Sequence, residues 1–111
     1  MQAPEPTGMI VVFVTVGALE EGEQIAEALV SERLAACVNV VGPVRSIYSW
    51  EGSLQRDEEY LLIIKTRETS FEPLASRVRE LHAYATPEII ALPIHAGSEA
   101  YLAWVAGATD K

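Results

Sequence analysis

The sequence predicts an α+β fold with the element order β-α-β-β-α-β and a further helix at the end of the chain. Three observations lead to this prediction. A continuous β-branched run is followed by a stretch with helical periodicity. Two long strands rich in valine and aromatic residues flank a tight-turn signal. A second helical stretch then leads into a short apolar strand. Two right-handed crossovers around a central hairpin give a ferredoxin-like sheet with both helices on one face.

The first strand and the first helix are separated by a change in hydrophobic period. The run over 9–16 reads MIVVFVTV, which is typical of a central strand buried on both faces. From about residue 20 to residue 34, Ile25 and Leu29 lie on one apolar side of a helix. Acidic residues crowd the first turn of this helix, where the helix dipole favours negative charge.

The central hairpin has unusually long strands. The strand over 35–50 is expected to bend or bulge next to Pro43, because proline cannot donate to a ladder. Glu51 and Gly52 suit a tight turn, and the return strand covers 54–66. Strands of about 5–6 residues are typical, so the outer parts of this hairpin lack partners within one chain. We therefore expect them to pair with neighbouring copies in an oligomer.

The second half of the chain repeats the pattern of helix and strand. Thr69 or Ser70 is expected to cap a helix that ends before Pro87, because the residue before a proline disfavours helical backbone. The fourth strand is expected over 88–94. A terminal helix then begins at Ser98.

The length of 111 residues fits one domain. We place this domain at 9–107. A disordered N-terminal tail is expected at 1–8, where prolines and a glycine gather, and a C-terminal tail is expected at 108–111.

Composition excludes several classes of protein. The net charge is −8, and the sequence has no basic face of the kind that nucleic-acid binding requires. One cysteine excludes an internal disulfide and suits a reducing cytosol. The run over 9–16 is shorter than the ~20 residues that a membrane helix needs. The N-terminus also lacks the basic region of a secretory signal. We therefore expect a cytoplasmic protein with neither a nucleic acid nor a membrane as partner.

Candidate site residues gather after the second helix. His82, Tyr84 and Glu88 are close enough in sequence to meet across one turn. The alternative is that His82 only complements the negative end of its helix. His95 follows a strand and is expected to face solvent, and Cys37 is expected to be a packed, unreactive thiol.

Other charged and aromatic residues have structural interpretations. The acidic run over 57–59 is typical of a solvated face. Arg45, Tyr48 and Trp50 near the hairpin turn form either a subunit interface or ordinary cross-strand pairs. The sequence contains no nucleophile with an adjacent base, so we expect no enzymatic activity.

Several sequence blocks carry a resemblance to a known family. In order, these blocks are ERLAACVNVV, SIYSWEG, EYLLIIKT, LHAY followed by PEIIALPI, and YLAW. They resemble the CutA family of divalent-cation tolerance proteins from about Met9 to Val105. The resemblance implies a cytoplasmic, ferredoxin-like homotrimer that is similar to the PII signalling proteins. It also implies a role in tolerance to divalent metals, copper especially.

The resemblance implies only part of a copper site, because this sequence has one of the three copper ligands known in the family. His82 matches a family histidine that binds copper in enterobacterial members. The other two ligands of that site, a histidine and a cysteine, are replaced here by Leu81 and approximately by Val14. His82 is thus the one metal-ligand candidate that the family pattern gives.

These inferences together predict a non-enzymatic homotrimer that responds to divalent metal ions and needs no cofactor. Its ligand, copper or another divalent cation, is expected in a cleft between subunits formed by Lys65, His82, Tyr84 and Glu88. The alternative is a PII-like sensor of a small anionic metabolite. Such a ligand would require basic residues such as Arg33, Arg45 or Lys65 around the cleft.

Overall fold

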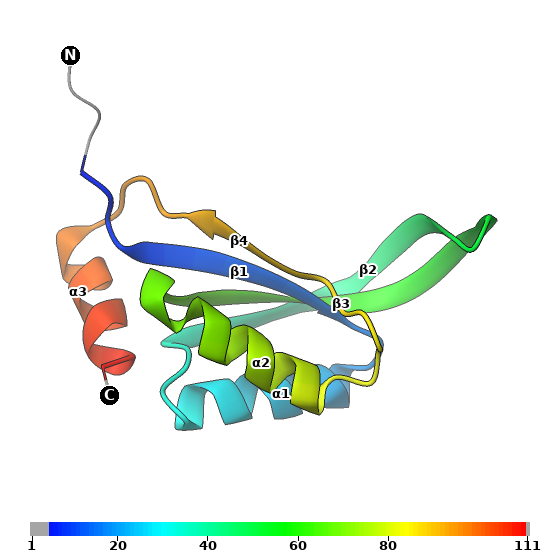
Figure 1. The fold of residues 1–111 in the computed structure, drawn as a ribbon, viewed down its shortest axis with the longest axis horizontal. Helices are drawn as coiled ribbons and strands as arrows, with labels where there is room; N and C mark the ends of the chain where they lie inside the picture. The colour runs from blue at the N-terminus through cyan, green and yellow to red at the C-terminus, as the bar shows by residue number, and fades with distance from the viewer. Residues whose placement is uncertain (1–4, 111) are drawn as a thin grey trace, which may run out of the picture.

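The structure of the chain, a computed structural model that describes residues 5–110, contains the predicted elements in the predicted order. These elements are β1 (Met9–Val16), α1 (Leu19–Ser31), β2 (Cys37–Trp50), β3 (Ser53–Arg67), α2 (Phe71–Leu81), β4 (Ile89–Pro93) and α3 (Glu99–Ala108). Within residues 5–110, the strands form one antiparallel sheet in the order β2-β3-β1-β4. Helices α1 and α2 lie along one face of this sheet (Figure 1). The prediction of an α+β ferredoxin-like fold is confirmed.

The core lies between the sheet and these two helices. Residues of β1 alternate strictly, and Ile10, Val12, Val14 and Val16 are buried against the helices. The intervening side chains of β1 are only half-buried. The prediction that β1 is buried on both faces is therefore wrong for this chain by itself, because the helices cover one face of the sheet.

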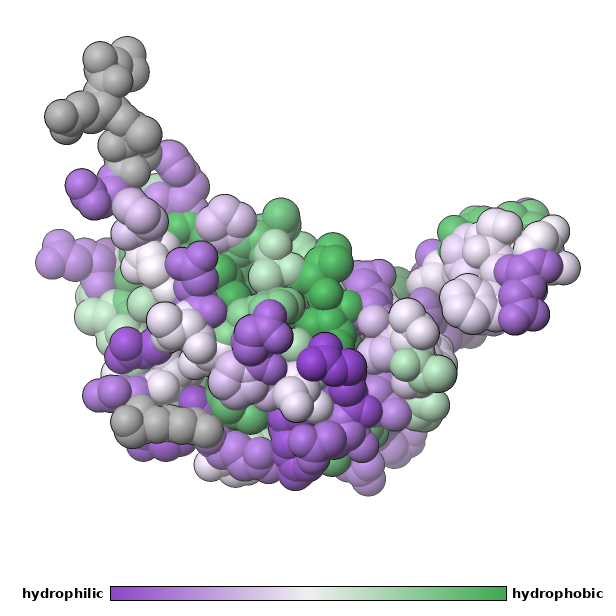
Figure 2. All heavy atoms as spheres, viewed as in Figure 1, coloured by the Kyte–Doolittle hydropathy of each residue, from purple (hydrophilic) through white to green (hydrophobic). Residues whose placement is uncertain are grey.

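The opposite face of the sheet carries a continuous apolar surface, which we call the uncovered face. Strand register brings side chains of all the strands together there. Ile90 and Leu92 on β4 are each 53% exposed. Figure 2 shows apolar side chains gathered along the edge of the molecule formed by β4 and β1, beside the helix layer. The apolar members are Val11, Phe13, Val41, Leu61, Ile63, Ile90 and Leu92.

The central hairpin has the predicted bend and turn. The pairing of β2 with β3 shifts register between Val41 and Val44, next to Pro43. Glu51 and Gly52 both have positive φ, 51° and 81°, as a two-residue hairpin turn requires. Beyond the register shift, β2 and β3 project from the body of the molecule as an arm formed by residues 44–59 (Figure 1).

Helix α2 starts differently from the prediction. Residues 68–70 form a short 3-10 turn, and within the described residues the Ser70 side chain makes no capping hydrogen bond. Thr69 also lies in this turn, so the expected cap is absent. Helix α2 ends at Leu81, before Pro87 as predicted, and Ser98 caps α3 by accepting a hydrogen bond from the Tyr101 N–H.

Both ends of the described chain are bonded to the fold. Thr7 donates a hydrogen bond to the Ile94 carbonyl at 2.5 Å, and Arg67 donates to the Ala106 carbonyl at the end of α3. Thr109 is buried and also contacts Arg67. Residues 5–8 and 108–110 of the two predicted tails are thus among the described residues, and residues 1–4 and 111 lie outside them. The tails stay a prediction.

None of the helices within residues 5–110 combines the length and hydropathy needed to cross a membrane.

Candidate functional site

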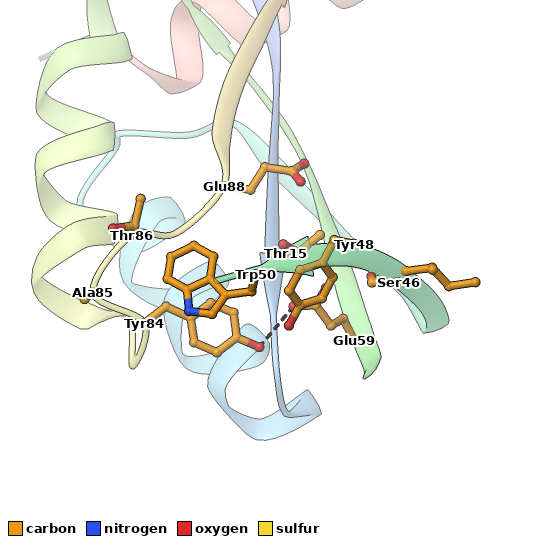
Figure 3. A pocket seen from close by; sticks show the side chains of 10 residues that line it. Thr15, Ser46, Tyr48, Trp50, Glu59, Tyr84, Ala85, Thr86 and Glu88 are labelled. Atoms are coloured by element: carbon orange, nitrogen blue, oxygen red, sulfur yellow. Dashed lines mark hydrogen bonds between the residues drawn. The ribbon is translucent and has the colours of Figure 1, made fainter. Parts of the chain in front are cut away.

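A pocket of about 660 Å³ lies where the arm curves over the end of β1 (Figure 3). Its other wall is the loop between α2 and β4, residues 82–88. The strand alternation places Thr15 and Glu59 on the uncovered face, at the floor of this pocket. The remaining lining residues come from the arm (Ser46, Ile47, Tyr48, Trp50) and from the loop (Tyr84, Ala85, Thr86, Glu88).

His82 fixes the loop to the sheet. Its side chain is fully buried, and its Nε2 lies 2.7 Å from the Thr15 carbonyl oxygen. Its Nδ1 accepts a hydrogen bond of 3.0 Å from the Tyr84 N–H. A carbonyl can only accept and an amide can only donate, so these contacts assign the neutral tautomer with the proton on Nε2. Both ring nitrogens are therefore occupied by backbone groups.

Helix α1 also holds the loop. The Glu21 carboxylate accepts a hydrogen bond of 2.8 Å from the Ala83 N–H. The same carboxylate lies 3.6 Å from His82 Nδ1. The sequence explained the acidic first turn of α1 by the helix dipole. In the structure, this turn also orients the loop that carries Tyr84.

Tyr84 connects the loop to the floor of the pocket. Its hydroxyl donates a 3.0 Å hydrogen bond to the Glu59 carboxylate (Figure 3). A side chain at Gly17 would place its Cβ 3.0 Å from this hydroxyl, so the hydroxyl packs closely against the backbone after β1, although Tyr84 as a whole is 39% exposed. Burial, followed by the hydrogen bond to Glu59, raises the pKa of Tyr84 to about 12 from the usual 10.0. Tyr84 is therefore a protonated donor at neutral pH.

The arm supplies the other two aromatic rings. The Tyr48 hydroxyl donates a hydrogen bond to Asp57 across the hairpin, and this bond is the main cause that raises the pKa of Tyr48. Trp50 is 57% exposed, and it lines the pocket together with Tyr84 (Figure 3). The pocket is thus lined by three aromatic rings and two carboxylates, those of Glu59 and Glu88.

The structure brings together only some of the predicted site residues. Tyr84 and Glu88 line one pocket with Tyr48 and Trp50, for which the sequence left a subunit interface and cross-strand pairing as alternatives. His82 lies behind the loop and does not line the pocket. Arg45 lies on the arm opposite Glu58 in the strand register, outside the set of lining residues.

Lys65 lies at the far end of the uncovered face. It is paired with Val11 and Cys37 in the sheet register, and its ammonium contacts Asn39. Strand rise puts it about 20 Å along β3 from Glu59. Within one chain, Lys65 is therefore separate from the pocket.

Two single residues complete the comparison with the sequence. His95 is exposed, as predicted. Cys37 is half-buried on the uncovered face, with its sulfur 4.0 Å from Lys65 Nζ. The expectation of a packed thiol is wrong for the single chain, because the Cys37 side chain is only half-buried there.

Metal ligands are sparse in this region. Among residues 5–110, no three His, Cys, Asp or Glu side chains gather closely enough to hold a metal ion. A metal at His82 Nδ1 would have to displace the Tyr84 N–H, and Leu81 and Val14 offer no donor atoms. Metal binding at His82 stays a prediction that requires this loop to rearrange.

Sequence reasoning missed Glu59. It lies in the acidic run 57–59, which we interpreted as a solvated face, yet Glu59 is only 7% exposed. The alternation of side chains along β3 places Glu59 on the same face as Leu61 and Ile63. Extending the strand alternation from Ile63 and Leu61 into the acidic run could have identified Glu59 as a buried residue.

Comparisons with known proteins identify the family to which this fold belongs. The family described as CutA1 divalent ion tolerance protein matches residues 10–108. Protein CutA, chloroplastic, from Arabidopsis thaliana is 52% identical over 100 residues, covering 90% of this chain and 55% of that protein. The divalent-cation tolerance protein CutA of Thermus thermophilus is 50% identical over 95 residues, covering 86% of this chain and 92% of that protein. The chain thus spans little more than half the length of the Arabidopsis relative.

Solved structures give the same result. The Cut A1 protein of Thermus thermophilus superposes with a TM-score of 0.90 at 48% identity, covering 92% of this chain and 99% of that one. CutA1 of Oryza sativa gives a TM-score of 0.91 at 46% identity, covering 99% of each chain. Because the family match covers nearly all of the described residues, the chain belongs to the CutA1 divalent ion tolerance protein family.

Proposed function

We propose that the chain works as a homotrimer that binds a ligand in the cleft between subunits and takes part in the response to divalent metal ions. The observation that carries the proposal is the uncovered face. An apolar sheet surface of this extent is unusual on a soluble monomer and is typical of an interface. The mechanism that we propose is binding, without a covalent step.

A second copy of the same chain is the partner that best fits the uncovered face. The face is built from strands of one sheet, and among residues 5–110 no further strand pairs with its edge strands, β2 and β4. The arm reaches beyond the body of the molecule, where its strands pair only with each other. These features support self-association, and the resemblance to PII-like proteins supports three copies. In this arrangement, Arg45, Tyr48 and Trp50 would lie at or near the subunit boundary.

The proposed ligand site is the pocket between the arm and the loop 82–88. Tyr84 and Glu88 line it directly, and His82 holds the loop in place. Lys65 could reach this cleft only from a neighbouring subunit. A divalent cation is supported by the family's description, by the two carboxylates of the pocket and by the net charge of −8. A single cysteine suits a reducing compartment, so we propose the cytoplasm as the location.

An anionic metabolite fits this pocket poorly. None of Arg33, Arg45 and Lys65 is among the described residues that line it. Arg33 instead donates to the Gly107 carbonyl at 2.9 Å. An anion placed here would face Glu59 and Glu88, so the pocket favours a positively charged ligand.

Thermal unfolding in the presence of added ions tests the proposed ligand. Copper(II) and magnesium chlorides should raise the melting temperature in a saturable way, since a ligand present at 100 times its Kd adds about 2.7 kcal/mol. Sodium phosphate and ATP should not. Because copper binds most nitrogen and oxygen sites tightly, His95→Ala is the control for adventitious binding. Stabilisation by phosphate and not by any divalent cation would contradict the proposal.

A further inference from the structure

Glu59 is a buried carboxylate without a cationic partner. Within residues 5–110, the ion pairs join Arg77 to Glu32 and Glu80, and the neutral His82 ring lies 3.6 Å from the Glu21 carboxylate. Glu59 receives the Tyr84 hydroxyl hydrogen bond but no ion pair there. Burying a negative charge is costly unless an opposite charge accompanies it. The floor of the pocket therefore has one negative charge that a positively charged ligand could neutralise.

Three aromatic rings surround this carboxylate. Tyr48 and Trp50 come from the arm, and Tyr84 comes from the loop on the opposite wall (Figure 3). All three side chains are more than a third exposed. Their ring faces carry the negative side of the aromatic quadrupole, which attracts cations. Rings from two walls around a carboxylate form a cage suited to an ammonium group.

Size and donor chemistry distinguish an organic cation from a bare metal ion. The volume of about 660 Å³ falls in the range of small-molecule pockets, about 300–1,000 Å³. The described residues contain no cluster of three metal-ligating side chains. Trp50 contributes ring surface but no metal-binding atom. The pocket is therefore large, negatively charged and aromatic, and short of metal ligands.

We propose that this pocket binds a small organic ammonium ion, with the cationic centre between the rings of Tyr48, Trp50 and Tyr84 and above the carboxylate of Glu59. Glu88 at the pocket rim adds a second negative charge that attracts the ligand. The inference rests on the proposed function in one respect, that this cleft is the ligand site. It adds an organic ammonium ion to the divalent cation proposed above as a ligand of this cleft, and it makes Glu59 and Trp50 the residues that select the ammonium ion.

The test uses tetramethylammonium chloride as the probe and nuclear magnetic resonance as the measurement. The chain has two tryptophans, so the Trp50 indole N–H reports on the pocket and the Trp104 indole N–H is an internal control. Tetramethylammonium should shift the Trp50 signal saturably and leave the Trp104 signal in place. tert-Butanol, a neutral molecule of similar shape, should bind at least about tenfold more weakly, since it has no charge for the rings to attract.

Matched variants test the role of the carboxylate. Glu59→Gln keeps an acceptor for Tyr84 but removes the charge, and it should weaken tetramethylammonium binding about tenfold or more. Glu58→Gln makes the same charge change on the adjacent, exposed residue of β3, and its affinity should stay within about twofold of wild type. Trp50→Leu, at an exposed position that leaves the core intact, should also abolish binding, as followed on the Tyr84 amide signal.

Three outcomes would overturn the inference. One is equal binding of tetramethylammonium and tert-butanol. Another is equal affinity of the Glu59→Gln and Glu58→Gln variants. The third is tetramethylammonium binding to the Lys65→Met variant but not to the wild-type protein. That result would mean that Lys65 of a neighbouring subunit already neutralises Glu59 in the wild type. Sedimentation of the same samples separates the two proposals: a trimer without tetramethylammonium binding contradicts only this inference, whereas a monomer contradicts the proposed assembly.

Discussion

The His82 ring joins α2, β1 and the pocket loop through its two nitrogens. Its Nε2–H donates to the Thr15 carbonyl, and its Nδ1 accepts from the Tyr84 N–H. The ring also lies 4.7 Å from the Tyr84 ring, centroid to centroid. Any effect of His82 on ligand binding is therefore expected to act through the position of Tyr84. This explains how a histidine at a helix end can matter to a site that it does not line.

Replacement of His82 should cost stability. His82→Ala leaves a buried carbonyl and an amide without partners and creates a cavity, so we expect a loss of about 2–4 kcal/mol in the free energy of unfolding. His95→Ala, at an exposed position, should change it by less than about 0.5 kcal/mol. Urea unfolding measures both. Equal effects of the two variants would contradict the structural role of His82.

The Tyr84 hydroxyl should make stability depend on alkaline pH. Its pKa is raised in the folded state to about 12, so the folded protein holds the proton more tightly than the unfolded chain. The resulting stabilisation is complete below pH 10 and is lost as the pH rises towards 12. Ultraviolet titration of tyrosinate should show one tyrosine ionising near pH 12, and Tyr84→Phe should remove this step. Persistence of the step in the variant would assign it to another tyrosine.

Among the elements, α1 approaches the sheet most closely at a glycine. A Cβ at Gly22 would lie 3.0 Å from a methyl group of Val16 and 3.3 Å from one of Leu62. Both of these neighbours are fully buried, so they cannot move aside freely. The close packing of helix on sheet therefore depends on the missing side chain.

Two glycine-to-alanine variants should change stability in opposite directions. Gly22→Ala gains helix propensity but overpacks the core, and we expect a net loss of about 1 kcal/mol. Gly107→Ala in α3 meets no atom within 4 Å and should gain about 0.5–1 kcal/mol. Thermal unfolding of both variants checks this prediction. A gain in both would mean that the helix–sheet contact at Gly22 is loose.

The type and order of the elements could be predicted from the sequence because each has a local signal. Nearby residues determine three of these signals: the change from strand to helix periodicity after β1, the Glu51-Gly52 hairpin turn, and the end of α2 before Pro87. The cap of α2 could not be predicted, because a 3-10 turn occupies the positions of its candidate capping residues. The uncovered face was also hidden, since a strand apolar on both sides looks the same whether helices or another copy covers it.

The pocket could be predicted only in part, since its residues come from three separate segments. Tyr84 and Glu88 share one loop, so their spacing indicated a site. Glu59 was hidden in an acidic run, and its burial depends on how the arm curves over β1. Lys65 lies far from Glu59 within one chain, so its place in a cleft between subunits stays a prediction.

In the molecule as a whole, the helices bury one face of the sheet and leave the other apolar. The beginning of β1 and α3 lie at one end, and the arm projects from the other (Figure 1). Exposed apolar side chains continue onto the arm (Figure 2). Leu54, which the strand register places near the tip of the arm, is one of them. We infer that this distribution is stable only when copies of the chain cover one another's sheets.

Sedimentation equilibrium at low protein concentration tests this assembly most directly. The wild-type chain should sediment as a single species of three times its mass of 12.1 kDa. Ile90→Asp, on the uncovered face, should dissociate it, whereas Val30→Asp, at an exposed apolar position on α1, should not. A wild-type protein that remains a stable, folded monomer would contradict the proposed covering of the sheet face and the cleft between subunits that depends on it.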